Sequence, residues 1–380
     1  MQIFDPLEIR GAKLPNRIVV SPMCEYSSTD GFANDWHLVH LGSRAVGGAG
    51  LVFTEATAVT PEGRISPQDL GIWKDDHIEF LARITKFIRS QGAVPGIQLA
   101  HAGRKGSTVR PWEGASAVPI SDGGWKPVAP SAIPFADTYA IPGALDEAGI
   151  RNVVRAFGDA ARRACEAGFG VVEIHSAHGY LLHEFLSPLS NRRTDSYGGS
   201  FENRTRLLKE VIVAVRRVWP EDRALFVRIS ATDWIEGGWD LDQSVELARR
   251  IGPLGVDLVD CSSGGILPSA KIPVAPGYQV PFAERIRSET GMPTGAVGVI
   301  TTAAQADLIL REEKADLVIM ARELLRRPYW ALDAARELGF PVSWPVQYLR
   351  AAPDGSPARE AVSWPDLKRC MSEQHGVAES

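Results

Sequence analysis

The sequence predicts a single (β/α)8 barrel, and three observations lead to it. Eight short apolar runs alternate with amphipathic segments along the 380 residues, a pattern typical of parallel strands joined by helical crossovers. The number eight favours a closed barrel. The competing fold, an open doubly wound sheet, would normally carry a GxGxxG turn after its first strand, and this chain has none there.

The expected strands are short apolar stretches bounded by Gly, Pro or polar residues. They cover residues 17–22, 51–56, 94–100, 170–175, 224–230, 256–261, 293–297 and 315–321. Amphipathic patterns predict helices over 35–47, 76–91, 146–167, 201–218, 242–253, 281–290, 302–313 and 328–338. Residues 8–17 are expected to form an N-terminal hairpin that closes the floor of the barrel.

Two segments fall outside the strand–helix alternation. Residues 101–145, rich in Pro and Gly, follow the third strand and are expected to overhang the barrel mouth as a lid excursion, because loops this long in a compact domain are usually functional or disordered. Trp112 and Trp125 favour an ordered excursion. Residues 351–380 show little apolar periodicity and are expected to form a loosely ordered C-terminal tail. The predicted domain therefore covers residues 1–350.

Polar side chains recur near the carboxyl ends of three expected strands. Gln98 alternates with Ile97 and Leu99, and the fourth and fifth strands carry Glu173, His175 and Arg228 in the same kind of alternation. Successive side chains of a strand point to opposite faces, so these four residues are expected to share the barrel interior. Barrel enzymes have their active sites at the C-terminal mouth, which favours a functional role over that of buried structural polar groups.

The overall composition narrows the class of protein. A net charge of −5 and the lack of a Lys/Arg cluster argue against nucleic-acid binding. No apolar run reaches the roughly 18 residues that a membrane span needs, and the start does not resemble a signal peptide. The four cysteines, at 24, 165, 261 and 370, form no CxxC or cluster-binding spacing. A reduced, soluble, cytoplasmic protein is expected.

The stretch HSAHGY places His175, His178 and Tyr180 close together, and its spacing alone leaves several chemistries open. A catalytic zinc would require a third ligand, and neither an HExxH motif nor a deaminase pattern is present, so no metal is expected. A Ser-His-Asp hydrolase is disfavoured because no GxSxG elbow occurs. A second HxxH, His37 and His40, falls in an expected helix, where surface or packed histidines are the favoured interpretation.

A cofactor site is the remaining possibility. Barrels commonly hold a phosphate at the loops after strands seven and eight, where this chain has Gly295 to Gly298 and Ala321-Arg322. Arg322 can grip a phosphate with two N–H groups. Arg228 would be a fixed cation deeper in the mouth, which suits a flavin, because the reduced ring is anionic near N1.

Several longer stretches resemble the Old Yellow Enzyme family of FMN-dependent ene-reductases, specifically its bacterial NADPH dehydrogenase and xenobiotic reductase branch. They are SPMCEYSS (21–28), EATAV (55–59), IQLAHAGRK (97–105), EIHSAHGYLLHEFLSPLSNRRTDSYGGSFENR (173–204), FVRIS (226–230) and MARELLRRP (320–328). The resemblance runs from about residue 2 to 350, and the long 173–204 block is its most specific part.

The resemblance implies a role for each of these motifs. His175 and His178 would bind the carbonyl or nitro oxygen of an activated alkene, Tyr180 would supply the proton after hydride transfer from flavin N5, and Tyr26 would touch the substrate. Lys105 and Trp112 would lie on the substrate side of the lid. The FMN-binding residues would be Ser21, Pro22, Met23, Cys24, Ala56, Gln98, Arg228, Gly298, Ala321 and Arg322.

The resemblance also implies partners. NADPH or NADH would be the hydride donor, an enone, enal or nitroalkene the substrate, and the assembly a homodimer or homotetramer in which Arg350 reaches a neighbouring active site. Thirty residues beyond Arg350 depart from the family pattern. The alternatives are a barrel flavoenzyme of other chemistry, such as a dienoyl-CoA or amine-oxidising relative, and a cofactor-free barrel lyase, hydrolase or ligand binder.

Overall fold

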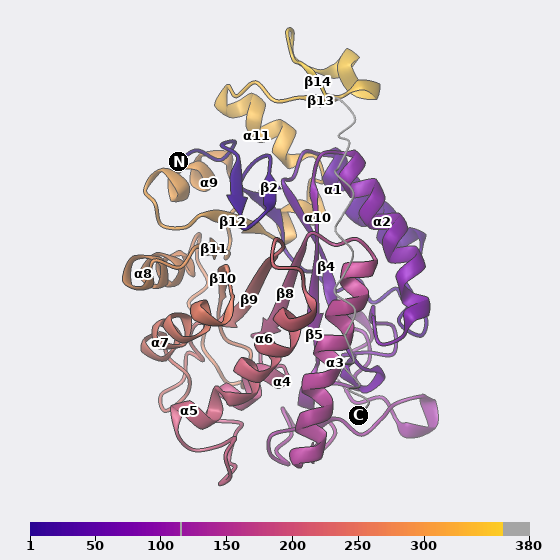
Figure 1. Ribbon diagram of the computed structural model, residues 1–380, viewed down its shortest axis with the longest axis vertical. Helices are drawn as coiled ribbons and strands as arrows, with labels where there is room; N and C mark the ends of the chain where they lie inside the picture. Colours follow the sequence, from indigo (N-terminus) through magenta and orange to yellow (C-terminus); the bar gives the residue numbers. More distant parts are fainter. Residues whose placement is uncertain (115, 360–380) are drawn as a thin grey trace, which may run out of the picture.

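Eight parallel strands close into a barrel in the computed structural model, which describes residues 1–114 and 116–359 (Figure 1). Each strand pairs with the next in chain order, and the last pairs with the first. The prediction of a closed (β/α)8 barrel is confirmed, and all eight expected strands are present. They are β3 (Ile18–Val20), β4 (Leu51–Ala58), β5 (Val94–Ala100), β8 (Val171–Ser176), β9 (Ala224–Ser230), β10 (Leu258–Ser262), β11 (Thr294–Ala296) and β12 (Leu317–Met320).

Helices surround the barrel and follow the predicted segments closely. Side chains of Asn34, Asp146, Asp240 and Thr302 accept main-chain N–H bonds at four helix starts, which is the usual N-cap device. The described helices on the predicted segments are α1 (Asp35–Val46), α2 (Ile78–Ser90), α3 (Glu147–Glu166), α5 (Phe201–Arg204), α6 (Arg206–Val218), α7 (Leu241–Ile251), α8 (Val280–Thr290), α9 (Ala303–Arg311) and α11 (Trp330–Leu338).

Three details differ from the sequence-based expectation. The predicted helix 201–218 is divided at Thr205 into α5 and α6, and the Thr205 hydroxyl donates to the Phe201 carbonyl at 2.9 Å. Two further helices, α4 (Leu181–Leu186) and α10 (Arg322–Arg326), were not expected. Both are too short for a helical period to register in the sequence.

The strand alternation divides the core into two clusters. Ile97, Leu99 and the equivalent aliphatic residues of β8 and β9 pack outward against the helices. The inward cluster includes Leu51, Phe53 and Phe226 and lies at the floor of the barrel. Further along β5, β8 and β9, the inward positions are polar. The barrel interior is therefore apolar at the floor and polar at the mouth.

The predicted N-terminal hairpin is present and covers the floor. Strands β1 (Leu7–Ile9) and β2 (Ala12–Leu14) pair antiparallel, and Ile9 and Leu14 join the inward cluster. Leu14 is 1% exposed, and burial of such a side chain stabilises the fold by about 1.5–3 kcal/mol. The hairpin lies at one end of the barrel, and the segment after β5 lies toward the other (Figure 1).

The segment after β5 contains short elements rather than a helix. They are η3 (Gly103–Lys105), η4 (Pro111–Glu113), η5 (Ile120–Asp122) and a small parallel pair, β6 (Val128–Ala129) with β7 (Gly143–Ala144). The Trp125 indole donates to the Glu62 carbonyl at 2.9 Å, and the Arg64 guanidinium lies 4.8 Å from its ring centroid. These contacts tie the excursion to the loop after β4, where short helix η1 (Pro61–Gly63) lies.

The chain after α11 returns to the hairpin end of the barrel (Figure 1). Short helix η7 (Val346–Ala351) lies between β13 (Trp344–Pro345) and β14 (Ala358–Arg359), which pair with each other. Arg359 donates to the carbonyls of Ala45, Val46 and Gln91. The first part of the predicted tail is therefore packed on the barrel, and residues 360–380 of that tail lie outside the described residues.

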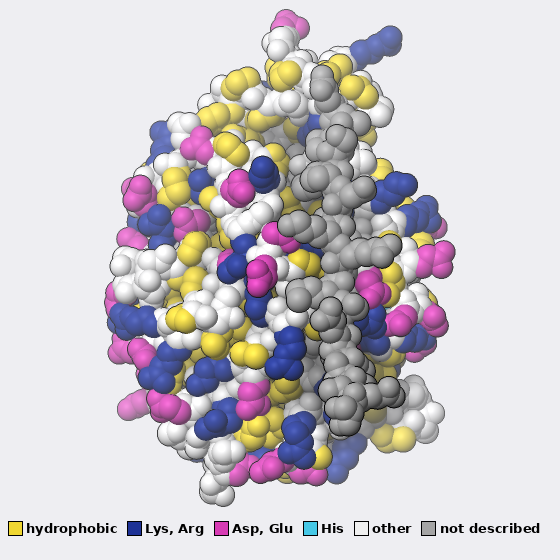
Figure 2. Space-filling view, viewed as in Figure 1, with side chains coloured by type: hydrophobic (Ala, Val, Ile, Leu, Met, Phe, Trp, Pro, Cys, Tyr) yellow, Lys and Arg dark blue, Asp and Glu magenta, His cyan; other side chains and the backbone are white. Residues whose placement is uncertain are grey.

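On the molecular face of Figure 2, the described Lys and Arg side chains are interspersed with Asp and Glu. None of the helices in residues 1–114 and 116–359 combines the length and the apolar character that crossing a bilayer requires.

Candidate active site

The four polar strand-end residues lie together in the barrel interior. Gln98 stands opposite Glu173 between β5 and β8, and His175 stands opposite Arg228 between β8 and β9. Gln98 Nε2 donates to Glu173 Oε1 at 2.7 Å, and Arg228 Nη1 donates to Ser21 Oγ at 3.0 Å. The alternation in the sequence thus places four polar side chains from three strands in the barrel interior near the mouth.

A fifth interior group, Asp260 on β10, was missed by the sequence analysis. It stands opposite Arg228, and its Oδ2 lies 3.1 Å from Arg228 Nε. The signal was available, because Asp260 alternates with Val259 and Cys261 as Arg228 does with its neighbours. Two buried carboxyls therefore share one cation. Burial raises the pKa of Glu173 to about 8, with Asp260 adding to the rise, and burial raises the pKa of Asp260 to about 6.

His175, His178 and Tyr180 form one cluster at the end of β8. The His175 ring lies 5.1 Å from the His178 ring and 5.1 Å from the Tyr180 ring, edge-on in both cases. His175 Nδ1 accepts the Ala177 N–H at 3.3 Å, so its proton resides on Nε2. His178 Nε2 is 2.7 Å from Ser262 Oγ. Within the described residues, no set of three or more His, Cys, Asp or Glu side chains is arranged to hold a metal ion.

The electrostatics of this cluster keep its members uncharged. Burial, followed by the cation of Arg228, holds the pKa of both histidines well below the usual 6.5. Burial raises the pKa of Tyr180 well above 10. At neutral pH each imidazole can therefore donate one N–H, and the phenol retains its proton. The arrangement can hold an oxygen atom with two neutral donors beside a weak acid.

The loop after β3 brings its predicted residues to the same mouth. Ser21 accepts from Arg228, and Pro22, Met23 and Cys24 continue in irregular, half-buried chain. Tyr26 has a left-handed backbone with φ +50°, and burial raises the pKa of its phenol. Burial, followed by the charges of Asp69 and Glu55, also raises the pKa of the Cys24 thiol. Ala56 stands opposite Gln98 on the neighbouring strand.

The second HxxH pair, His37 and His40, is buried in α1. This agrees with the interpretation of packed helix histidines rather than surface ones. His37 Nε2 lies 3.1 Å from Glu55 Oε1, and His40 Nε2 lies 3.4 Å from Glu25 Oε1. The other Glu55 oxygen accepts the Glu25 N–H at 3.1 Å. These histidines therefore brace the loop that carries Cys24 and Tyr26, which the sequence did not indicate.

A cavity of about 430 Å³ lies beyond the ends of β11 and β12. Gly298, Ala321 and Arg322, which were expected to bind a phosphate, line this cavity, and Ser262, another lining residue, lies 2.7 Å from His178 Nε2. Gly298 has φ +122°, and a Cβ there would lie only 3.0 Å from Gln279 Nε2 and 3.1 Å from the Tyr278 ring. Other lining residues that sequence reasoning missed are Tyr278, Gln279, Val299 and Arg326.

The lid contributes contacts as well as cover. Lys105 Nζ donates to the main-chain carbonyls of His178 at 2.8 Å and Gly265 at 2.6 Å. It also lies 4.1 Å from the Phe135 ring centroid and 5.5 Å from that of Tyr180. Trp112 is 65% exposed and meets Tyr26 edge-on at 5.8 Å.

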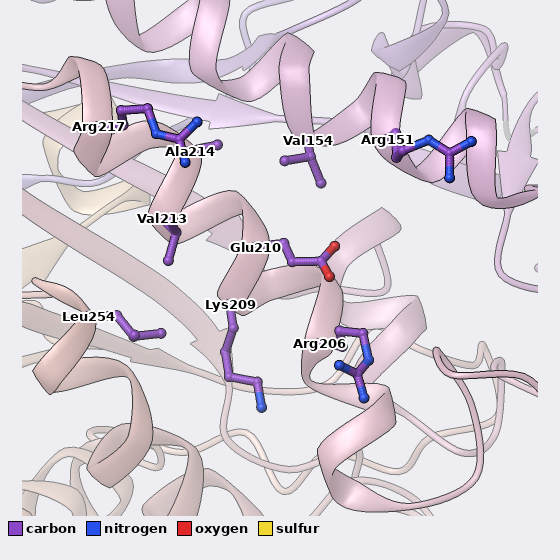
Figure 3. A pocket seen from close by; sticks show the side chains of 9 residues that line it. All are labelled: Arg151, Val154, Arg206, Lys209, Glu210, Val213, Ala214, Arg217 and Leu254. Carbon is purple, nitrogen blue, oxygen red and sulfur yellow. The ribbon is translucent and has the colours of Figure 1, made fainter.

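Two features lie away from the mouth. Arg350 is exposed on η7, in the segment at the hairpin end of the barrel (Figure 1), so the fold does not bring it to its own chain's site. A groove of about 480 Å³ lies between α3 and α6, and Figure 3 shows the side chains that line it. Its basic rim includes Arg151 and Arg217, its apolar floor includes Val154, and none of the predicted site residues lines it.

Comparison with known proteins shows which family the chain resembles. A family model described as "NADH:flavin oxidoreductase / NADH oxidase family" matches residues 2–339. The NADPH dehydrogenase of Geobacillus thermodenitrificans is 54% identical over 350 residues, covering 92% of this chain and 98% of that protein.

Two solved structures share the fold. An old yellow enzyme homologue from Zymomonas mobilis superimposes with a TM-score of 0.74 at 28% identity, covering 90% of this chain and 94% of that one. The complex of 2-naphthoyl-CoA reductase with 2-naphthoyl-CoA superimposes with a TM-score of 0.80 at 26% identity. The match covers 90% of this chain but 52% of that longer chain.

Proposed function

The chain belongs to the NADH:flavin oxidoreductase / NADH oxidase family, of which the Old Yellow Enzymes are members, and on that premise we propose that it is an FMN-dependent ene-reductase. Its enzyme class is that of its close relative, an NADPH dehydrogenase. The proposed substrates are α,β-unsaturated carbonyl and nitro compounds, reduced at the activated C=C bond. NADPH or NADH serves as the hydride donor.

The observation that carries this proposal is the cluster of His175, His178 and Tyr180 beside an internal cation. Two neutral imidazoles 5.1 Å apart can place two N–H donors on one oxygen atom. The phenol next to His175 keeps its proton at neutral pH because burial raises its pKa. A metal site or a hydrolase would not need this combination of two neutral donors and a protonated phenol.

The residues of the mouth fit a flavin mononucleotide. Arg322 and Arg326 line the cavity beyond β11 and β12 and suit a phosphate, which arginine can grip with two N–H groups. Arg228 and Gln98 suit the polar edge of the ring, and Ser21 to Cys24 with Ala56 would lie along it. When bound, FMN would supply the hydride-transfer chemistry between NAD(P)H and the alkene.

The chain's own residues then act on the substrate oxygen. Reduction of an enone builds negative charge on its carbonyl oxygen, so N–H donors aimed at that oxygen stabilise the transition state more than the ground state. Burial, with Arg228 and Lys105 adding to its effect, lowers the pKa of both imidazoles and keeps them neutral, so each can donate an N–H to that oxygen. His175 and His178 bind and orient the oxygen.

Tyr180 delivers the proton in this proposal. The α carbon of the reduced alkene needs a proton from a weak acid placed against it. Tyr180 is a phenol beside His175 whose pKa burial raises, and Nζ of Lys105 in the lid lies 5.5 Å from its ring centroid. Tyr26, from the opposite loop, contacts the substrate.

The absorbance of the purified protein provides the most direct test. The expected result is a yellow protein whose heat-released cofactor is FMN, and which oxidises NADPH under anaerobic conditions when 2-cyclohexenone is added. Arg322→Ala should weaken FMN binding without unfolding the barrel, because Arg322 is exposed. A protein without a flavin spectrum after incubation with FMN would refute the proposal.

We also propose that the protein is a homodimer or homotetramer in which Arg350 serves a neighbouring active site. Arg350 is exposed on η7, between β13 and β14, and these strands lie at the hairpin end of the barrel (Figure 1), so any role in catalysis requires a second copy. Mixed oligomers of Arg350→Ala with Tyr180→Phe should regain activity, because one site then has both residues. Mixed oligomers that stay inactive would contradict the crossing.

A further inference from the structure

The turn that carries His178 and Tyr180 has a costly backbone. His178 and Gly179 are both left-handed, with φ +57° and +70°, and the Tyr180 N–H donates to the Ala177 carbonyl at 3.2 Å. A left-handed conformation is unfavourable for a residue with a side chain. The turn therefore depends on contacts from the surrounding structure.

Three partners hold the main chain of this turn. Ser230 Oγ accepts the His178 N–H at 2.9 Å, and Lys105 Nζ donates to the His178 carbonyl. The third partner is His183 on α4, whose Nδ1 accepts the Gly179 N–H at 2.9 Å. Because Nδ1 accepts this bond, the ring proton of His183 resides on Nε2.

A buried carboxylate lies close to Nε2. His183 Nε2 lies 3.0 Å from Asp233 Oδ1, and both side chains are 0% exposed. Neither atom makes a hydrogen bond of regular geometry within the described residues, so this close polar contact is the relation between the two side chains. The second oxygen, Asp233 Oδ2, accepts from Ser187 Oγ at 2.6 Å and from the Trp239 N–H at 2.7 Å.

The loop after β9 fixes Asp233 in place. The Trp239 ring stacks on Phe201 at 5.8 Å with an interplanar angle of 16°, and its indole donates to Ser244 Oγ at 2.7 Å. The Asp233 N–H also donates to the Trp239 carbonyl at 2.8 Å. Asp233 is therefore positioned by packing that does not touch the mouth of the barrel.

From this chain of contacts we infer that Asp233 and His183 are positioning residues for substrate protonation. Asp233 keeps the His183 proton on Nε2, so Nδ1 can accept the Gly179 N–H. This hydrogen bond fixes the backbone of the turn and thereby the positions of the His178 and Tyr180 side chains. The inference rests on the proposed function, because it assigns these two residues to the same turn that orients the substrate oxygen and delivers the proton.

Asp233→Asn tests the inference with little change of volume. Two donors, Ser187 Oγ and the Trp239 N–H, both require an oxygen at the Oδ2 position, so the new amide N–H2 has to face His183 Nε2. The His183 proton then moves to Nδ1, opposite the Gly179 N–H, and the turn loses its third partner. A similar change of tautomer follows when the aspartate of a Ser-His-Asp triad becomes asparagine.

The expected kinetic effect is confined to one half of the reaction. In Asp233→Asn, alkene reduction at saturating 2-cyclohexenone should slow by on the order of 10- to 100-fold, because small misplacements of reacting groups have effects of this size. Flavin reduction by NADPH should change little. Ser187→Ala is the matched control, because it removes a buried hydrogen bond from the same carboxylate without moving the His183 proton. In this variant both half-reactions should stay near the wild-type rates.

A second variant separates positioning from stability. In His183→Asn the side-chain oxygen takes the place of Nδ1 and can accept the Gly179 N–H, although Asp233 loses its partner. This variant should unfold more easily than Asp233→Asn and yet reduce the alkene faster. If alkene reduction follows the order of stability instead, or if Asp233→Asn matches Ser187→Ala in both half-reactions, the inference is overturned.

A measurement without activity decides the tautomer. In wild-type protein with ¹⁵N-labelled histidine, the His183 resonances, assigned by their loss in His183→Asn, should show an unprotonated Nδ1 and a protonated Nε2. The reverse pattern would overturn the inference even where a variant does not fold. A wild-type protein that binds no flavin would refute the proposed function but not the tautomer of His183, because the ¹⁵N pattern would still report on the Asp233–His183 pair.

Discussion

Removal of the paired imidazoles should weaken the binding of a phenol in a graded way. A phenolate resembles the charged oxygen of the reacting substrate, and it should give a long-wavelength charge-transfer band with the oxidised flavin. His175 and His178 each supply one N–H. Among the described hydrogen bonds, the partner of His178 Nε2 is Ser262 Oγ, at 2.7 Å. The affinity of the phenol therefore measures both donors directly.

The size of the effect follows from the two donors. A hydrogen bond to a charged group contributes about 1.5–3 kcal/mol, so His175→Ala or His178→Ala should weaken phenol binding by about 10- to 150-fold. The two rings are in contact at 5.1 Å, so the double variant should lose less than the sum of the single losses. Because both imidazoles are neutral at pH 7, their titration should add no step to the affinity between about pH 6 and pH 8.

The assay is a titration of each oxidised variant with a para-substituted phenol, followed at the charge-transfer band. His77→Ala is the matched control, because His77 is another buried histidine but lies against Phe32 and Trp73 on η2 (Asp75–His77). Its loss should leave the phenol affinity unchanged. A band of full strength and unchanged affinity in His175→Ala or His178→Ala would refute the oxygen-binding role.

Three further predictions concern the proton donor, the turn and the buried acid. Tyr180→Phe should slow alkene reduction by about 100-fold or more while flavin reduction by NADPH stays near the wild-type rate; equal slowing of both halves in stopped-flow traces would exclude Tyr180 as the donor. Gly199→Ala, at φ +79° in open space, should lower the free energy of unfolding by about 1–2 kcal/mol. Gly179→Ala should lower it further in denaturant titrations, because a Cβ at φ +70° would lie 2.1 Å from a carbonyl oxygen; equal losses would contradict this. Burial raises the pKa of Glu173 from 4.5 to about 8, so between these pH values the folded state keeps a proton that the unfolded state releases. The contribution of Glu173 to the free energy of unfolding is therefore fully present at low pH and is lost as the pH rises from about 4.5 to about 8. Between those values the stability of the wild type should therefore fall relative to Glu173→Gln, and parallel stability curves for the two proteins would show that Glu173 is ionised in the fold.

The sequence indicated the site only where residues follow a strand. Gln98, Glu173, His175 and Arg228 occupy alternate positions near strand ends, and the barrel brings them together because parallel strands in register meet at one level. Asp260 obeys the same rule and could have been found in this way. The cavity beyond β11 and β12 was expected from Gly298, Ala321 and Arg322, yet Tyr278 and Gln279 enter it from a loop with no periodic signal.

The supporting groups could not be predicted from spacing. His37 and His40 looked like ordinary helix residues, and only the packing of α1 against the loop after β3 shows that they brace Glu25 and Glu55. Trp239 had no expected role; its partner Phe201 is 38 positions earlier in the chain and comes beside it only when α5 packs against the loop after β9.

The sequence by itself determined the barrel, its eight strands, its hairpin and the polar ends of its strands. These features depend on local periodicity, which a single chain displays directly. Only the tertiary structure decided which tautomer His183 adopts, which carbonyls Lys105 holds, and that two buried carboxyls share the cation of Arg228. Those properties arise from atoms that are far apart in sequence and become neighbours only on folding, where the loss of water makes each contact strong enough to fix a proton or a turn.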